Sequence, residues 1–125
     1  MTRALADTNA LLWWVTDDRR LSPAARKAIG DGEVAVHFSA ASVWQAEIKA
    51  AAGKLLGGDK LLEALEADHF LELAVTARHA CEAARLPLLH RDPFDRMIVA
   101  QARLEDLIVI TSDPKIGEYG PSVLW

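Results

Sequence analysis

The segment His90-Arg91-Asp92-Pro93-Phe94-Asp95-Arg96 and the apolar run 107–110 that follows it indicate the class of fold. Asp92 can cap a helix, and Pro93 suits the first helical position, where its missing N–H costs nothing. The predicted helix continues through residue 102. Residues 107–110 are typical of a buried strand because the run is short, continuous and apolar, and this strand leads to Asp113. A helix start and a strand end therefore each present an acid.

The N-terminal residues repeat the pattern of a short strand that ends at an acid. Residues 4–6 are apolar, and Asp7 follows them directly. In a parallel sheet the carboxyl ends of the strands share one edge, and open α/β folds bind ligands there. We therefore expect Asp7, Asp95 and Asp113 to lie close together at that edge.

Signals for strands and helices alternate along the rest of the chain. Further strands are predicted at 34–38, 69–74 and 123–125, and further helices at 11–15, 24–29, 41–52, from 61 onward and at 77–84. This alternation predicts a three-layer α/β domain in which helices flank a parallel sheet of four to five strands, joined by right-handed crossovers.

Length and composition restrict the possible classes of protein. The 125 residues, 51% of them hydrophobic and 26% charged, predict a single domain over 1–125. We expect no signal peptide and no membrane span, because no basic start precedes a long apolar run. The single Cys81 excludes an intrachain disulfide and favours a cytoplasmic location. With a net charge of −4, binding of a polyanion would need a metal, a local basic patch or a partner.

The three acids at the predicted sheet edge suit a divalent cation. Carboxylates that converge in a partly dry cleft repel one another, so either some of them bind protons or a cation joins them. Oxygen ligands suit Mg²⁺ or Mn²⁺, and such an ion can activate water and stabilise charge on a phosphodiester. Each acid also has a structural alternative, because aspartate is common at helix caps and turns. For Asp92 the role of helix cap is sufficient.

Several neighbouring polar residues could orient these acids or a bound water. They also suit caps and strand ends, and they are Thr8, Asn9, Asp92, Thr111 and Ser112. The four histidines are scattered without the spacing of metal ligands, which argues against a zinc site; they are His37, His69, His79 and His90.

Five segments, taken together, resemble the PIN-domain ribonuclease toxins of the VapC type. They lie at 7–14, 39–55, 86–96, 111–114 and 123–125 and cover nearly the whole chain in the order of that family. The resemblance implies a bacterial or archaeal type II toxin, an endoribonuclease that uses Mg²⁺ or Mn²⁺ and cuts tRNA or other RNA. It also implies a homodimer, neutralised by a VapB-type antitoxin whose carboxyl-terminal segment covers the active site. The family's metal-binding acids correspond to Asp7, Asp95 and Asp113.

One position departs from the family pattern. The family usually has a glutamate directly after the tryptophan at position 44, and this chain has Gln45. Glutamine keeps the shape and one carbonyl oxygen but loses the negative charge. Glu47 cannot replace it, because two residues along a helix are a rotation of about 200°. Gln45 therefore predicts a catalytic site with weaker metal binding and slower cleavage. The glutamine itself is either a deliberate glutamate-to-glutamine change or a natural attenuation of the enzyme.

Two groups of basic residues are candidates for contact with RNA. One contains Arg19, Arg20, Arg26 and Lys27, and the other contains Lys49 and Lys54. The first group also suits an ordinary solvated helix face. The acidic pocket would in addition attract an arginine or lysine of an antitoxin through charge-assisted hydrogen bonds.

The main alternative is a catalytically silent PIN module that only binds an antitoxin in a repressor complex, and Gln45 keeps this alternative open. A phosphoacceptor receiver domain is disfavoured because residues 43–58 contain no aspartate. A phosphatase with the pattern Asp-x-Asp-x-Thr is disfavoured because Asn9 stands in place of the second aspartate.

Overall fold

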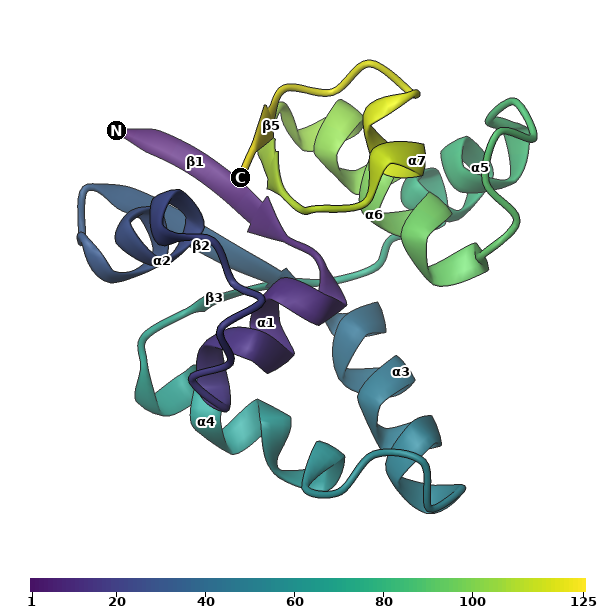
Figure 1. Cartoon of the computed structure of the whole chain (residues 1–125). Coiled ribbons are helices and arrows are strands. Elements are labelled where there is room, and N and C mark those ends of the chain that lie inside the picture. Colours follow the sequence, from purple (N-terminus) through teal and green to yellow (C-terminus); the bar gives the residue numbers. More distant parts are fainter.

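A single parallel sheet of five strands forms the centre of the molecule in the computed structural model, which describes residues 1–125 (Figure 1). The strands are β1 (Thr2–Ala6), β2 (Val34–Ser39), β3 (Leu71–Leu73), β4 (Ile108–Ile110) and β5 (Val123–Leu124). Their order across the sheet is β3-β2-β1-β4-β5, and all neighbouring pairs are parallel. The predicted parallel sheet of four to five strands is therefore confirmed.

Helices connect the strands, and most of them begin where the sequence predicts. They are α1 (Thr8–Val15), α2 (Pro23–Gly30), α3 (Ala40–Ala51), α4 (Leu61–Ala67), α5 (Ala77–Arg85), α6 (Pro93–Glu105) and α7 (Pro114–Gly117), with a short 3₁₀ helix at Gly58–Lys60. The side chains of Asp7, Ser22, Ser39, Thr76 and Asp92 accept hydrogen bonds from the first backbone N–H groups of their helices. These caps satisfy donors that the helix itself leaves free.

Alternation along β1 divides the core between the two faces of the sheet. Ala4 and Ala6 pack on one face with residues of α1, α2, α3 and α4, whereas Leu5 packs on the other face with α6 and α7. Figure 1 shows α5, α6 and α7 gathered on one side of the sheet and α1, α2 and α4 on the other. The predicted three-layer arrangement is confirmed.

Two local expectations need correction. The strand predicted at 69–74 begins only at Leu71, because His69 has a φ of 62° and the Phe70 N–H donates to the Leu65 carbonyl, which still belongs to the end of α4. The short helix α7 is not predicted, although Asp113 caps it and Pro114 is its first residue.

The order of the strands reverses direction at β1. The chain moves outward from β1 to β2 and β3, and then adds β4 and β5 on the opposite side of β1. The Asp7 N–H donates to the Ile110 carbonyl at 3.0 Å, so the carboxyl ends of β1 and β4 lie side by side. Open α/β sheets bind ligands outside the strand ends at this kind of reversal.

Trp44 is the only tryptophan that is largely exposed, with 64% of its surface accessible. Its ring meets the Phe94 ring edge to face, with centroids 5.4 Å apart. These two rings and Ala40, Ala41, Val75, Pro93 and Met97 line an apolar groove of about 520 Å³.

None of the helices combines the length and apolarity that crossing a lipid bilayer would require.

Candidate metal centre

Asp7 lies at the carboxyl end of β1 and also begins α1. Its Oδ1 accepts the Ala10 N–H at 2.9 Å, and its Oδ2 accepts the Thr111 hydroxyl at 2.5 Å. Burial raises the pKa of the Asp7 carboxyl, while these two hydrogen bonds oppose the rise and the nearby Asp113 adds to it. Asp7 thus caps a helix and also brings a carboxylate to the switch point of the sheet, the edge at β1 where the order of the strands reverses.

Thr111 connects the ends of β1 and β4. Its hydroxyl donates to the Asp7 carboxylate and its Oγ1 accepts the Asp113 backbone N–H at 3.0 Å, so one buried side chain contacts both acidic residues. That Thr111 orients the acids for chemistry stays a prediction.

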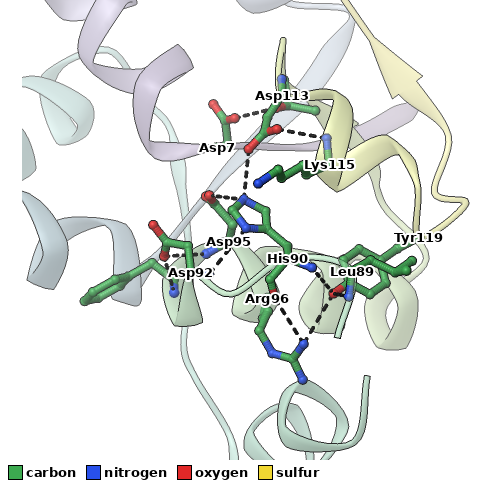
Figure 2. Close-up of polar contacts among 11 residues, drawn as sticks. Asp7, Leu89, His90, Asp92, Asp95, Arg96, Asp113, Lys115 and Tyr119 are labelled. Carbon is green, nitrogen blue, oxygen red and sulfur yellow. Dashed lines mark hydrogen bonds and ion pairs between the residues drawn. The ribbon is translucent and has the colours of Figure 1, made fainter. Parts of the chain in front are cut away.

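Asp95 and Asp113 meet from two different helices. Asp113 uses Oδ1 to cap α7 by accepting the Lys115 N–H at 2.9 Å, so its Oδ2 is the oxygen that faces the other side chains of this centre. Asp95 stands at the third position of α6, and Figure 2 shows it beside Asp113 and Asp7. Burial comes first among the causes that raise the pKa of Asp95 to about 6; Asp92, Asp7 and Asp113 add to it, and His90 opposes it.

This donor set fits a hard divalent cation. The three carboxylates come from separate elements and are buried or half-buried, and the charges of neighbouring acids are among the causes that raise the pKa values of Asp7 and Asp95. A bound cation would offset this repulsion, because it is a positive charge among oxygen donors. The structure therefore places Asp95 and Asp113 together in one cluster with His90, and Asp7 lies close enough for its charge to affect the pKa of Asp95.

His90 is the residue at this centre that sequence reasoning missed. Its Nε2 lies 2.8 Å from Asp95 Oδ2 and 3.0 Å from Asp113 Oδ2. Ligand atoms of these three side chains all lie within 4.8 Å of one another. The description of all four histidines as scattered is wrong for His90. Its position two residues before the helix cap Asp92 was the available signal.

The other predicted supporting residues have different surroundings. Asp92 caps α6 by accepting the N–H groups of Phe94 and Asp95, as predicted. The Thr8 hydroxyl donates to Ser42 Oγ at 2.8 Å and contacts α3 rather than an acid. Asn9 and Ser112 are exposed, and neither side chain bonds to the acids.

Gln45 lies on α3, one turn after Ser42. Only 8% of its surface is exposed, and its Oε1 is buried without a hydrogen-bond partner. Because Ser42 contacts Thr8, the residue after Asp7, this side of α3 packs against the start of α1. An unsatisfied buried carbonyl is costly and calls for an explanation, such as a ligand that supplies the missing contact.

The two predicted basic groups differ in how far their charges are neutralised. Arg20, Arg26 and Lys27 form ion pairs with Asp18, Asp17 and Asp31, respectively. Lys49 and Lys54 form none and line a cavity of about 480 Å³, together with Lys60, Arg20, Trp13 and Asn9. Arg20 also lies over the Trp13 ring, 4.9 Å from its centroid. Arg19 is exposed and lies outside this cavity.

Comparison with known proteins places this geometry in a family. A family model of the PIN domain matches residues 4–120. A search among curated protein sequences gives no match. A chain of a toxin–antitoxin complex from Klebsiella pneumoniae is similar with a TM-score of 0.68 and 26% identity, covering 96% of this chain and 94% of that chain.

Two further solved structures show the same fold at lower identity. VapBC2 from Rickettsia felis, bound to a DNA fragment from its promoter, matches with a TM-score of 0.67 and 13% identity over 98% of this chain and 97% of that chain. FitAcB from Neisseria gonorrhoeae matches with a TM-score of 0.56 and 22% identity over 96% and 95% of the two chains. The chain therefore belongs to the PIN domain family, with the fold of solved chains from VapBC-type toxin–antitoxin complexes, as the resemblance to VapC-type toxins predicts.

Proposed function

We propose that this chain is the toxin component of a type II toxin–antitoxin system and a divalent-metal-dependent endoribonuclease, with tRNA as the first substrate to test. The observation that carries the proposal is the convergence of Asp7, Asp95 and Asp113 at the switch point of a PIN fold. PIN domains are generally metal-dependent nucleases, and the raised pKa values of Asp7 and Asp95 fit a centre that requires a cation.

In this proposal the three acids would hold Mg²⁺ or Mn²⁺. When bound, such an ion supplies activation of water and stabilisation of charge on the scissile phosphate. The protein's own contribution is to fix the acids before the substrate arrives. Thr111 holds Asp7, and the backbone of α7 holds one oxygen of Asp113. Cleavage would then be a hydrolysis without a covalent intermediate.

An antitoxin is the proposed protein partner. The similar structures from Klebsiella pneumoniae and Rickettsia felis are toxin–antitoxin complexes, and the latter holds promoter DNA. In the present chain the half-buried acids would accept an arginine or lysine from such a partner, because charge-assisted hydrogen bonds to carboxylates are strong. The homodimer that the resemblance implies stays a prediction.

The basic cavity beside α1 is the proposed path of the RNA backbone. Lys49, Lys54 and Lys60 have no acidic partner, so their charges are free to contact phosphates. Asn9, two residues after Asp7, belongs to the cavity lining and thereby connects the cavity with the acids. Arg19 contributes only if the RNA extends beyond the cavity.

Replacing both Lys49 and Lys54 by alanine should weaken RNA binding and reduce its salt dependence. Each lost phosphate contact lowers the slope of log affinity against log salt by about 0.7 for single strands, so the double variant should lose about 1.4. Fluorescence anisotropy with labelled tRNA fragments at several salt concentrations would measure both effects. Lys27→Ala is the matched control, because Lys27 lies outside the cavity and pairs with Asp31. An unchanged slope in the double variant would place the RNA elsewhere.

The proposed activity is tested by cleavage of total tRNA in the presence and absence of Mn²⁺. We expect slow cleavage that requires the ion and falls at least about tenfold in Asp7→Asn, because the amide keeps the shape of the carboxylate but loses its charge. Cleavage that persists in excess EDTA, or that is equal in the variant, would contradict the proposal.

The second candidate function is the catalytically silent PIN module that binds an antitoxin. The observation in its favour is Gln45, a neutral side chain where the family usually has an acid. Antitoxin binding without RNA cleavage, also after Gln45→Glu, would support this second candidate.

A further inference from the structure

His90 forms a hydrogen-bonded link between α6 and α7. Its Nε2 lies between one oxygen of Asp95 at 2.8 Å and one oxygen of Asp113 at 3.0 Å, and only 12% of its side chain is exposed (Figure 2). Asp113 Oδ1 is already used to cap α7, so His90 takes the oxygen that remains. The imidazole thus contacts the same carboxylate oxygens that an ion would need.

The second ring nitrogen determines which way these hydrogen bonds run. The Asp92 N–H donates to His90 Nδ1 at 3.3 Å, so Nδ1 is an acceptor and the proton of the neutral ring is on Nε2. Nε2–H is therefore shared as a donor between two carboxylates. A histidine that ligates a metal has the reverse arrangement, with a lone pair toward the ion and an N–H donated by the other nitrogen. His90 is arranged as a donor to the acids.

The backbone on either side of His90 is firmly held. The Tyr119 hydroxyl accepts the N–H groups of Leu89 and His90 at 3.1 and 2.9 Å and donates to the Pro87 carbonyl at 2.6 Å. Arg96 donates to the carbonyls of Pro87 and His90. Because this loop is fixed, the ring can leave the acids only by rotation of its own side chain.

We propose that His90 competes with the divalent ion for Asp95 and Asp113. Without the ion, Nε2–H holds the two carboxylates together; binding of the ion requires this N–H to give them up. The inference rests on the proposed function, since it assumes that these acids bind the ion. It has two opposite consequences: His90 lowers the affinity for metal and stabilises the metal-free fold.

The test compares His90→Ala with the unaltered protein in two measurements. Isothermal titration calorimetry with Mn²⁺ should show binding roughly tenfold tighter in the variant, because the ion no longer displaces hydrogen bonds to charged acceptors. Thermal unfolding in EDTA should show a lower melting temperature, because two carboxylates lose their donor. Tyr119→Phe is the control for a merely structural effect: it releases the loop but keeps the imidazole, so it should lower the melting temperature without tightening Mn²⁺ binding.

The other outcomes separate the inference from the function on which it rests. Weaker Mn²⁺ binding by His90→Ala would identify His90 as a metal ligand, and equal binding would show that His90 does not affect the ion. Either result would contradict the proposed competition between His90 and the ion, but it would leave the proposed metal centre unaffected. Absence of Mn²⁺ binding in the folded protein and in every variant, Gln45→Glu included, would overturn both the metal centre and the inference.

Discussion

Replacing Gln45 by glutamate should raise metal-dependent cleavage of RNA by roughly 10- to 100-fold, the range that a single supporting ligand at a metal site typically contributes. Gln45 is almost fully buried, and its Oε1 has no partner within the protein. A carboxylate there would add a fourth negative charge on a helix that packs against the start of α1, directly after Asp7. The same change should lower the melting temperature in EDTA, because burying another charge is unfavourable without a cation.

The rate of tRNA cleavage with Mn²⁺ measures this effect. The double variant Gln45→Glu with Asp7→Asn is the control, because it restores the acid on α3 while removing one at the end of β1. We expect high activity only in the single variant. Equal rates for Gln45→Glu and the unaltered chain would show that position 45 does not limit catalysis.

The second large effect concerns Asp95, whose substitution should stabilise the metal-free protein and abolish metal binding. The pKa of Asp95 is raised to about 6 from 3.8, so the folded state holds this proton more tightly than the unfolded state. The resulting stabilisation is complete below pH 3.8 and is lost as the pH rises through about 6. At pH 7 the ionised carboxylate therefore works against the fold.

For Asp95→Asn at pH 7 in EDTA we expect a gain of about 1–3 kcal/mol in the free energy of unfolding. This exceeds the loss of about 0.3–1 kcal/mol from removing an acid in the first turn of a helix. Thermal unfolding from pH 4 to 7.5 would measure the gain, which should shrink toward the acidic end. Mn²⁺ should then stabilise the unaltered protein and leave the variant unchanged.

Asp59→Asn provides the control for this experiment, because Asp59 is exposed and forms no ion pair. It should show neither the gain nor the loss of the Mn²⁺ effect. A lower melting temperature for Asp95→Asn in EDTA would mean that contact with His90 outweighs the repulsion among the acids.

The sequence predicts the parts of this molecule that depend on local chemistry. Asp92 with Pro93 marks the start of α6, and the apolar runs before Asp7 and Asp113 mark the ends of two strands. That Asp7 and Asp113 lie at the same edge then follows from a general property of parallel sheets, whereas the position of Asp95 depends on where α6 packs. These inferences need only the order of elements along the chain.

The role of His90 could not be predicted in this way. Its ring reaches Asp113, which lies 23 residues further along the chain, because Tyr119 and Arg96 fix the loop that carries it. The ion pair that neutralises Arg26 could not be predicted either, because its partner Asp17 comes from the loop before α2. Both contacts depend on how separate elements and loops pack against each other, which no local pattern contains.

The caps on α1 and α7 affect how the proposed activity can be lost over evolutionary time. Asp7 and Asp113 each spend one oxygen on the start of a helix, and asparagine caps a helix about as well as aspartate does, whereas alanine does not. A lineage could therefore lose the proposed catalysis through asparagine at either position and still keep both helix caps. Alanine would remove both the carboxylate and the helix cap and so would also destabilise the fold. Inactive but folded descendants of this protein should therefore carry asparagine at these two positions.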